Sequence, residues 1–267
     1  MYLTKLIVFL ALVPAPAIGT VFLERSTRQQ HAKLSDVCIG YMTLEGPISN
    51  GKQFKQGLEQ LMNHPLVQGI ILTINSGGGS VTASWEIFEA IKRVNAQKPI
   101  ISYVEEVCAS GAYLAACATT KIVANPMATV GSIGVVRTVE ELQPTEFKQD
   151  GLKGKVIIHR FKKGKFKQLG SSFDPMTDED KEQLNKEVDF IYQQFCNNVA
   201  TYRGLSLEQV EAQHSLSFTG IEALELGLID TTGSFDDALT LLARELATRG
   251  VTISSDFNLK ESMLMPD

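Results

Sequence analysis

The sequence predicts an α/β fold in which a mainly parallel sheet is flanked by helices on both faces. From Val37 onward, short β-rich runs alternate with helical runs, which is the pattern of strands joined by crossover connections. Most of the β-rich runs are continuously apolar, as expected for strands that are covered on both sides. The chain has 267 residues, of which 44% are hydrophobic and 21% are charged. This composition excludes a disordered chain, a collagen-like fibre and a multi-span membrane protein.

The expected strands are short apolar runs bounded by turn residues. They cover residues 37–44, 67–74, 99–104, 121–124, 133–136 and 155–160. Between the first three of them, residues 52–62 and 81–95 have the spacing of helices. The second of these helices presents an apolar side, which is expected to pack on the sheet and is made of Trp85, Phe88, Ile91 and Val94.

A longer helix is expected to begin after Thr177 and to stop at Gly204. Thr177 is a suitable N-cap, and three carboxylates follow it in the first turn, where the positive end of the helix dipole favours them. Apolar residues recur every three or four positions along it, which indicates a core or subunit contact rather than a ligand site. This stripe consists of Leu184, Val188, Ile191, Phe195, Val199 and Tyr202.

The amino terminus departs from this globular pattern. Residues 6–23 contain no charge, a length at the lower limit for spanning a bilayer of ~30 Å. Lys5 before the apolar run and Ala15-Pro16-Ala17 within it also fit a cleaved secretory signal. Either an anchor or a signal is therefore expected, and both place the rest of the chain outside the cytoplasm, at or beyond the membrane. The expected organisation is a signal or anchor segment (1–24), a polar linker (25–36), one domain (37–250) and a tail (251–267).

Charge and cysteine content exclude several classes of function. The net charge is −5, so the chain lacks the basic surface that draws proteins to nucleic acid. The four cysteines lie far apart, without a C-x-x-C pair or a histidine at ligand spacing, so neither a metal site nor a redox motif is expected. They are better interpreted as small buried residues, which are Cys38, Cys108, Cys117 and Cys196.

A glycine-rich loop follows the second expected strand. It reads Asn75-Ser76-Gly77-Gly78-Gly79-Ser80 and precedes the expected helix 81–95. Such a loop exposes backbone N–H groups that can bind an anion or a developing oxyanion. It has neither the G-K-S/T of a phosphate-binding loop nor the G-x-G-x-x-G of a dinucleotide site. A tight strand-to-helix turn without chemistry is the alternative.

A second loop places a serine directly after the third expected strand. It reads Cys108-Ala109-Ser110-Gly111-Ala112-Tyr113. A serine at such a corner is a possible nucleophile, and the N–H of Gly111 can donate to the oxyanion that its attack creates. Helix capping by Ser110 is the alternative. A third segment, residues 131–134 (GSIG), is interpreted as a bend near the other loops, without a chemical role.

A serine nucleophile needs a base, and the sequence does not favour histidine for it. None of the four histidines has an evident carboxylate partner, so a Ser-His-Asp triad is not supported. A lysine can replace histidine when desolvation lowers its pKa from ~10.4 toward neutrality. The candidates lie in residues 161–171 (FKKGKFKQLGS), although most of these lysines must be solvated surface charges.

Taken together, these motifs resemble the signal peptide peptidase A family of membrane-bound serine peptidases in its short, single-copy form. The resemblance spans residues 37–247 and rests on INSGGGSVTASWEIFEAI, ASGAY, TTKIVANPMATVGSIGVV, GKFKQLGSSFDPMTDEDKEQL and FTGIEALELGLIDTTG. It implies a ClpP/crotonase-like fold, a Ser-Lys dyad without cofactor or metal, and a ring-like homo-oligomer that degrades signal-peptide remnants in the membrane. It also implies Ser110 as nucleophile, Lys167 as general base and the N–H groups of Gly78 and Gly111 as oxyanion donors.

The chain departs from the family pattern in its two loops. The family usually has N-S-P-G-G where this chain has a glycine at position 77, and S-G-G-Y where this chain has Ala112. Two other functions remain open from the sequence. One is a crotonase-like acyl-CoA enzyme, which would use the same glycine donors without Ser110 or Lys167. The other is a catalytically silent, membrane-tethered assembly or binding subunit.

Overall fold

The computed structural model describes residues 10–12, 20–22, 38–141, 161–172 and 174–251. The chain forms two compact units, one made of Met1–Ile133 with Cys196–Asp267 and the other of Gly134–Phe195. Residues 37–250, predicted as one domain, include parts of both units.

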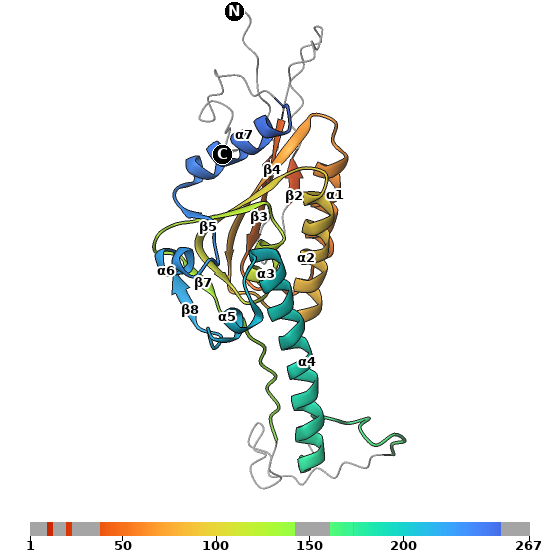
Figure 1. Ribbon diagram of the computed structural model, residues 1–267. Helices are drawn as coiled ribbons and strands as arrows, with labels where there is room; N and C mark the ends of the chain where they lie inside the picture. The colour runs from red at the N-terminus through yellow and green to blue at the C-terminus, as the bar shows by residue number, and fades with distance from the viewer. Residues whose placement is uncertain (1–9, 13–19, 23–37, 142–160, 173, 252–267) are drawn as a thin grey trace, which may run out of the picture. The chain divides into compact units, whose positions relative to one another are not determined.

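The first unit is built on a mainly parallel sheet (Figure 1). The main path runs in the order β3-β4-β5-β6-β9, with every pair on it parallel. Beyond β6, β5 also pairs with β7, and β8 joins β7 antiparallel. These strands are β3 (Cys38–Glu45), β4 (Val67–Ser76), β5 (Ile100–Ala109), β6 (Lys121–Ala124), β7 (Thr129–Gly131), β8 (Ser217–Thr219) and β9 (Thr231–Thr232).

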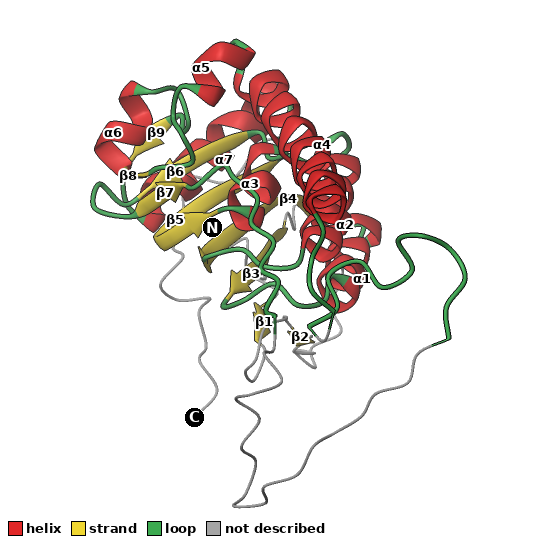
Figure 2. Ribbon diagram, turned by 90° about the horizontal axis from the view of Figure 1, so that it is seen from below, coloured by secondary structure: helices red, strands yellow, loops and turns green. Residues whose placement is uncertain are grey.

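Helices cover both faces of this sheet, which confirms the predicted α/β class (Figure 2). One face packs on α7 (Phe235–Thr248), whose buried Leu242 and Leu246 join Ile71 and Ile101 of the central strands in a core cluster. Because successive strand residues point to opposite faces, Ile70 faces the other layer. That layer contains α1 (Lys52–Asn63), α2 (Val81–Asn95) and α3 (Gly111–Cys117).

The predicted strand at 133–136 is wrong. These residues have no strand structure, and the strand of this region is β7, which ends at Gly131. Ser132 follows with a φ of 51°, a left-handed conformation that no extended strand continues through. The bend predicted at 131–134 is therefore present. The strand predicted at 155–160 lies outside the described residues.

The long helix α4 (Asp178–Arg203) matches the prediction and connects the second unit to the first along the chain. Its start is fixed by Thr177, whose hydroxyl accepts the Asp180 N–H at 3.1 Å while the Asp180 carboxylate accepts the Thr177 N–H at 3.0 Å. Two short helices follow α4 in the first unit and lead to β8 and β9. They are α5 (Leu207–Glu211) and α6 (Gly220–Glu225).

Most of the amino-terminal segment lies outside the described residues. Within it, β1 (Leu10–Leu12) and β2 (Thr20–Phe22) pair antiparallel. Among the described residues, no helix has both the length and the apolar character needed to cross a bilayer. The linker at 25–36 and the tail beyond Val251 are not described.

Candidate active site

Ser110 occupies a strained corner between β5 and α3. Its φ of 52° and ψ of −125° place a non-glycine residue in a region that such residues rarely adopt and that is concentrated at functional sites. The backbone is held from both sides, because the Ser110 N–H donates to the Gly131 carbonyl at 2.9 Å and the Ser110 carbonyl accepts the Leu114 N–H at 3.0 Å. The hydroxyl makes no capping bond to α3, so the capping alternative does not hold.

The glycine-rich loop after β4 lies against this corner. A Cβ placed on Gly78 would lie 2.6 Å from the Gly111 nitrogen and 2.9 Å from the Ser110 Cβ, so only glycine permits this approach. Gly78 also has a φ of +87°, which favours glycine independently. The two residues predicted as oxyanion donors, Gly78 and Gly111, are thus brought together beside Ser110.

The backbone amides around Ser110 differ in their partners. The Gly78 N–H donates to the Ser76 hydroxyl at 3.2 Å. By contrast, neither the Gly79 N–H nor the Gly111 N–H has a hydrogen-bond acceptor among the residues that the structure describes. The Gly79 nitrogen lies 3.7 Å from the position of a Cβ on Gly111, so these two amides are neighbours. Two neighbouring amides without acceptors are what an oxyanion requires.

The loop is anchored to the chain segment after β3. The Ile48 N–H donates to the Gly78 carbonyl at 2.9 Å, and the Ser80 N–H donates to the Ile48 carbonyl at 2.7 Å. A Cβ on Gly79 would overlap the Ile48 carbonyl oxygen, so this close backbone contact requires glycine. The Ser80 hydroxyl then caps α2 by accepting the Ala83 N–H at 3.4 Å.

Lys167, the predicted base, belongs to the second unit. Its N–H donates to the Gly164 carbonyl at 3.3 Å, and its side chain is exposed in the single chain. Its neighbour Lys165 forms an ion pair with Glu179 and lies over the Phe166 ring at 5.5 Å. No ion pair of Lys167 is found within the described part of the chain. Ser110 and Lys167 are in separate units, so the dyad stays a prediction.

The cysteines near Ser110 do not offer a competing nucleophile. All four cysteine side chains of the sequence are buried, as predicted. Cys108 lies two residues before Ser110, and burial raises the pKa of its thiol well above the ordinary value. Burial also raises the pKa of Cys117 to about 12. Both thiols therefore stay protonated at neutral pH and lack the reactive thiolate form.

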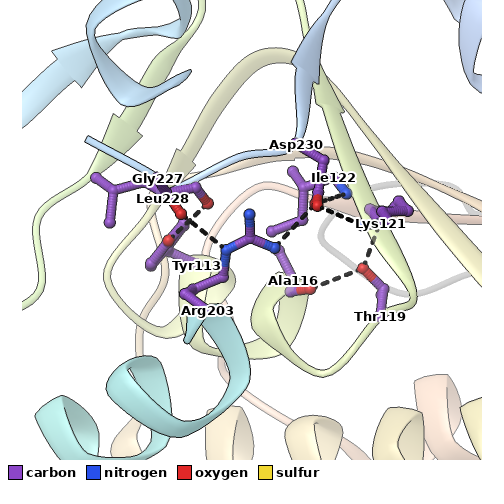
Figure 3. Close-up of polar contacts among 9 residues, drawn as sticks. All are labelled: Tyr113, Ala116, Thr119, Lys121, Ile122, Arg203, Gly227, Leu228 and Asp230. Atoms are coloured by element: carbon purple, nitrogen blue, oxygen red, sulfur yellow. Dashed lines mark hydrogen bonds and ion pairs between the residues drawn. The ribbon is translucent and has the colours of Figure 1, made fainter. Parts of the chain in front are cut away.

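A buried polar network fixes the far end of α3 (Figure 3). Tyr113, three residues after Ser110 and fully buried, donates its hydroxyl to the Leu228 carbonyl at 2.7 Å. Beside it, Arg203 at the end of α4 contacts the Asp230 carboxylate at 2.9 Å, and its side chain is only 8% exposed. Asp230 also accepts the Ile122 N–H of β6 at 2.9 Å. Helix α3, which begins directly after Ser110, is thereby held next to a network linking α4, β6 and the segment before β9.

Replacing Arg203 with methionine is expected to lower the free energy of unfolding by about 3 kcal/mol, because the change leaves the Asp230 carboxylate buried without its main partner. Burial opposes ionisation of Asp230, but the Arg203 charge and the Ile122 N–H outweigh it and hold the pKa of Asp230 below its ordinary value. A group with a lowered pKa stabilises the fold above its unfolded pKa and loses this contribution as the pH falls.

Urea denaturation of wild type and Arg203→Met at several pH values tests this. The stability difference should be largest near pH 7 and should narrow as the pH falls below about 4. The exposed Arg249 forms an ion pair with Glu245 at 3.4 Å and serves as the control site. If Arg203→Met were no more destabilising than Arg249→Met, the network would not hold α3 in place.

Several residues of this site were not predicted from the sequence. Ser76 bonds to the Gly78 amide, Ser84 of α2 packs against Gly111, and the Gly79 amide has no acceptor among the described residues. The only available signal was their position inside or just after the glycine-rich loop. Ser84 and Gly79 lie against segments far apart in the chain, Gly111 and Ile48, which a local pattern does not reveal.

Among the described residues, no group of three or more His, Cys, Asp or Glu side chains is placed to hold a metal ion.

Comparison with known proteins gives two family matches and several relatives. The profile of peptidase family S49 matches residues 92–249, and that of Clp protease matches residues 43–132. A Methanocaldococcus jannaschii protein with a protease name is 36% identical over 188 residues, which are 69% of this chain and 58% of that protein. "Capsid assembly protease C" of Escherichia phage lambda is 29% identical over 206 residues, covering 77% of this chain and 46% of the phage protein.

An Enterococcus faecium protein named as a signal peptide peptidase is 28% identical over 208 residues, covering 76% of this chain and 58% of its own length. The chain thus spans about half the length of these relatives. The S49 match includes the strand, serine corner and helix of the site described above, and the Clp match includes the glycine-rich loop. The resemblance seen in the motifs is confirmed together with the ClpP-like α/β fold, and the chain belongs to peptidase family S49.

Proposed function

We propose that this protein is a serine endopeptidase that cleaves apolar peptides, including signal-peptide remnants, with Ser110 as nucleophile and Lys167 as general base. The observation that carries the proposal is the geometry of Ser110. Its backbone is held in a strained left-handed conformation, its hydroxyl does not cap α3, and two amides that find no acceptor in the described part of the chain lie beside it. Membership in family S49 and the protease names of the relatives support the same reaction class.

The reaction is an acyl transfer in two steps. Neutral Lys167 takes the proton of the Ser110 hydroxyl, and the Ser110 oxygen bonds to the peptide carbonyl carbon. The carbon–nitrogen bond then breaks, and the departing amine receives the proton from Lys167. Water attacks the resulting ester, and the same lysine passes a proton from the water to the Ser110 oxygen as the acid product leaves. This chemistry requires no metal or organic cofactor.

The tetrahedral oxyanion is stabilised by the amides beside Ser110. Gly111 supplies one donor. In the glycine-rich loop, the Gly78 N–H is already bonded to Ser76, whereas the Gly79 N–H is without an acceptor among the described residues. We infer that the loop donates through Gly79 in this arrangement, and that Gly78 shapes the turn that presents it.

A base of this kind needs a pKa near neutrality, and loss of contact with water lowers the pKa of a lysine in that direction. Lys167 is exposed in the single chain. We therefore propose that assembly into a ring-like homo-oligomer covers Lys167 and completes the dyad. The apolar amino-terminal segment, acting as an anchor or signal, would place the enzyme at the membrane, where signal-peptide remnants arise.

The test uses the full chain in detergent with an apolar fluorogenic peptide and a fluorophosphonate, which phosphonylates activated serines. Cleavage, together with mass-spectrometric mapping of the phosphonyl group to Ser110, is the expected result. If the folded and assembled protein neither cleaves a panel of apolar peptides nor reacts with the probe, the result would favour a catalytically silent assembly subunit over a peptidase. Turnover of an acyl-CoA instead of peptides would favour the crotonase-like alternative.

A further inference from the structure

We propose that Ser76 is a positioning residue for the oxyanion hole, holding Gly78 in its left-handed turn so that the Gly79 N–H points toward the reacting carbonyl. The inference deepens the proposed peptidase function and rests on it. Ser76 acts only through the backbone of the loop and does not contact the substrate. Its role is therefore distinct from those of Ser110 and Lys167.

The hydroxyl of Ser76 is buried and bonded on both sides. Ser76 is the last residue of β4 and is 2% exposed. Its hydroxyl donates to the Gly46 carbonyl at 2.6 Å and accepts the Gly78 N–H at 3.2 Å. A single side chain thus connects the turn after β3 to the glycine-rich loop, and the proton of the hydroxyl is committed to Gly46.

The frame to which Ser76 ties the loop also carries the nucleophile. The Gly46 N–H donates to the Asn75 carbonyl at 3.0 Å, so the turn after β3 and the end of β4 are bonded in both directions. On the other side of β4, Ser76 pairs in register with Cys108 of β5, two residues before Ser110. The positions of the Gly78 amide and of Ser110 are therefore both fixed by the same short stretch of sheet, the ends of β4 and β5.

Loss of the Ser76 hydroxyl should move the loop without unfolding it. Two backbone hydrogen bonds of Ile48 would remain: its N–H would still donate to the Gly78 carbonyl, and its carbonyl would still accept the Ser80 N–H. The loop would therefore stay attached. The Gly78 N–H would lose its partner, and Gly78 with its φ of +87° could rotate to find another. Such a rotation turns the next amide, that of Gly79. Displacements near 1 Å in a catalytic geometry cost about 100-fold in rate.

The experiment compares Ser76→Ala and Ser76→Thr with Ser102→Ala in the full chain. Ser102 is a matched control, because it lies on β5, is 0% exposed, and its hydroxyl has no hydrogen-bond partner within the described structure. Ser76→Ala should lower kcat on the apolar peptide by about 30- to 100-fold, with KM changed by less than about twofold. Ser76→Thr keeps the hydroxyl and should recover most of kcat, and Ser102→Ala should stay near wild type.

A second measurement does not depend on peptidase activity. Hydrogen–deuterium exchange of a peptide covering residues 75–80 should be faster in Ser76→Ala than in wild type, because the Gly78 N–H loses its acceptor. If wild type is inactive but this exchange still rises, the peptidase function fails while the holding of the loop by Ser76 stands. Unchanged exchange, or a kcat loss in Ser76→Ala no greater than in Ser102→Ala, would overturn the inference.

Discussion

Replacing Ser110 with alanine is expected to lower kcat on an apolar peptide by about 10³-fold or more, and replacing Lys167 with alanine should have a comparable effect. The first change removes the atom that attacks the carbonyl, and the second removes the group that takes its proton. Because the Ser110 hydroxyl caps no helix, its loss removes no hydrogen bond of α3. The free energy of unfolding should therefore change by no more than about 0.5 kcal/mol.

The control for the lysine is Lys165→Ala. Lys165 lies two residues from Lys167 and has the same charge, but it already forms an ion pair with Glu179. Its removal should leave kcat within about threefold of wild type, since an exposed pair contributes at most about 1 kcal/mol. Light scattering first shows that the Lys167→Ala and Lys165→Ala variants assemble to the same extent. Peptide-cleavage kinetics then decide which lysine is the base. Full activity of Lys167→Ala with loss in Lys165→Ala would move the base to Lys165.

The bounds of a strand or helix were predictable from the sequence where the pattern of buried apolar residues alone determines them. The strand at 121–124 and helix α2 have their expected bounds, because continuous apolar runs and a clear helical stripe leave little choice. Strand β5 was expected to stop at Val104 but continues to Ala109 through Glu105 and Glu106, whose side chains are exposed. Charged residues end an apolar pattern, yet here the backbone pairing with β7 extends the strand.

Helix α7 shows a second limit. It was not predicted, although Ser234 and Asp237 form a capping box at its start and Leu239, Leu242 and Leu246 have helical spacing. The contacts that shape the site are even harder to predict from sequence than this helix. The position of Ser110 after a strand suggested a nucleophile, whereas the bond from Ser76 to Gly46 joins residues 30 positions apart and has no sequence signal.

Gly111→Ala is expected to lower kcat/KM by about 100-fold, although helix propensity alone would favour alanine at this position by up to ~1 kcal/mol. The obstacle is Ser84 of α2. A Cβ on Gly111 would overlap the Ser84 hydroxyl oxygen and would lie 2.7 Å from the Ser84 Cβ. Because Ser84 is 2% exposed and cannot move into solvent, the start of α3 must shift instead. That shift moves the Gly111 N–H, which is a proposed oxyanion donor.

The same contact predicts which second change restores activity. Ser84→Ala removes the hydroxyl but keeps the Cβ at 2.7 Å, so Gly111→Ala combined with Ser84→Ala should recover only in part. Ser84→Gly removes both atoms, and the double variant should return to within about tenfold of wild type. Ser84→Gly alone costs helix stability of ~1 kcal/mol, so thermal unfolding must accompany the kinetics.

The order of recovery is the decisive feature of this series. A general loss of stability would make the double variant with Ser84→Gly less active than Gly111→Ala, because glycine weakens α2. If the Gly111 amide is shifted by a steric clash, Ser84→Gly should instead restore more activity than Ser84→Ala, although Ser84→Gly is the more destabilising change. If Ser84→Gly failed to improve a folded Gly111→Ala protein, packing of α2 against the serine corner would not set the position of this donor.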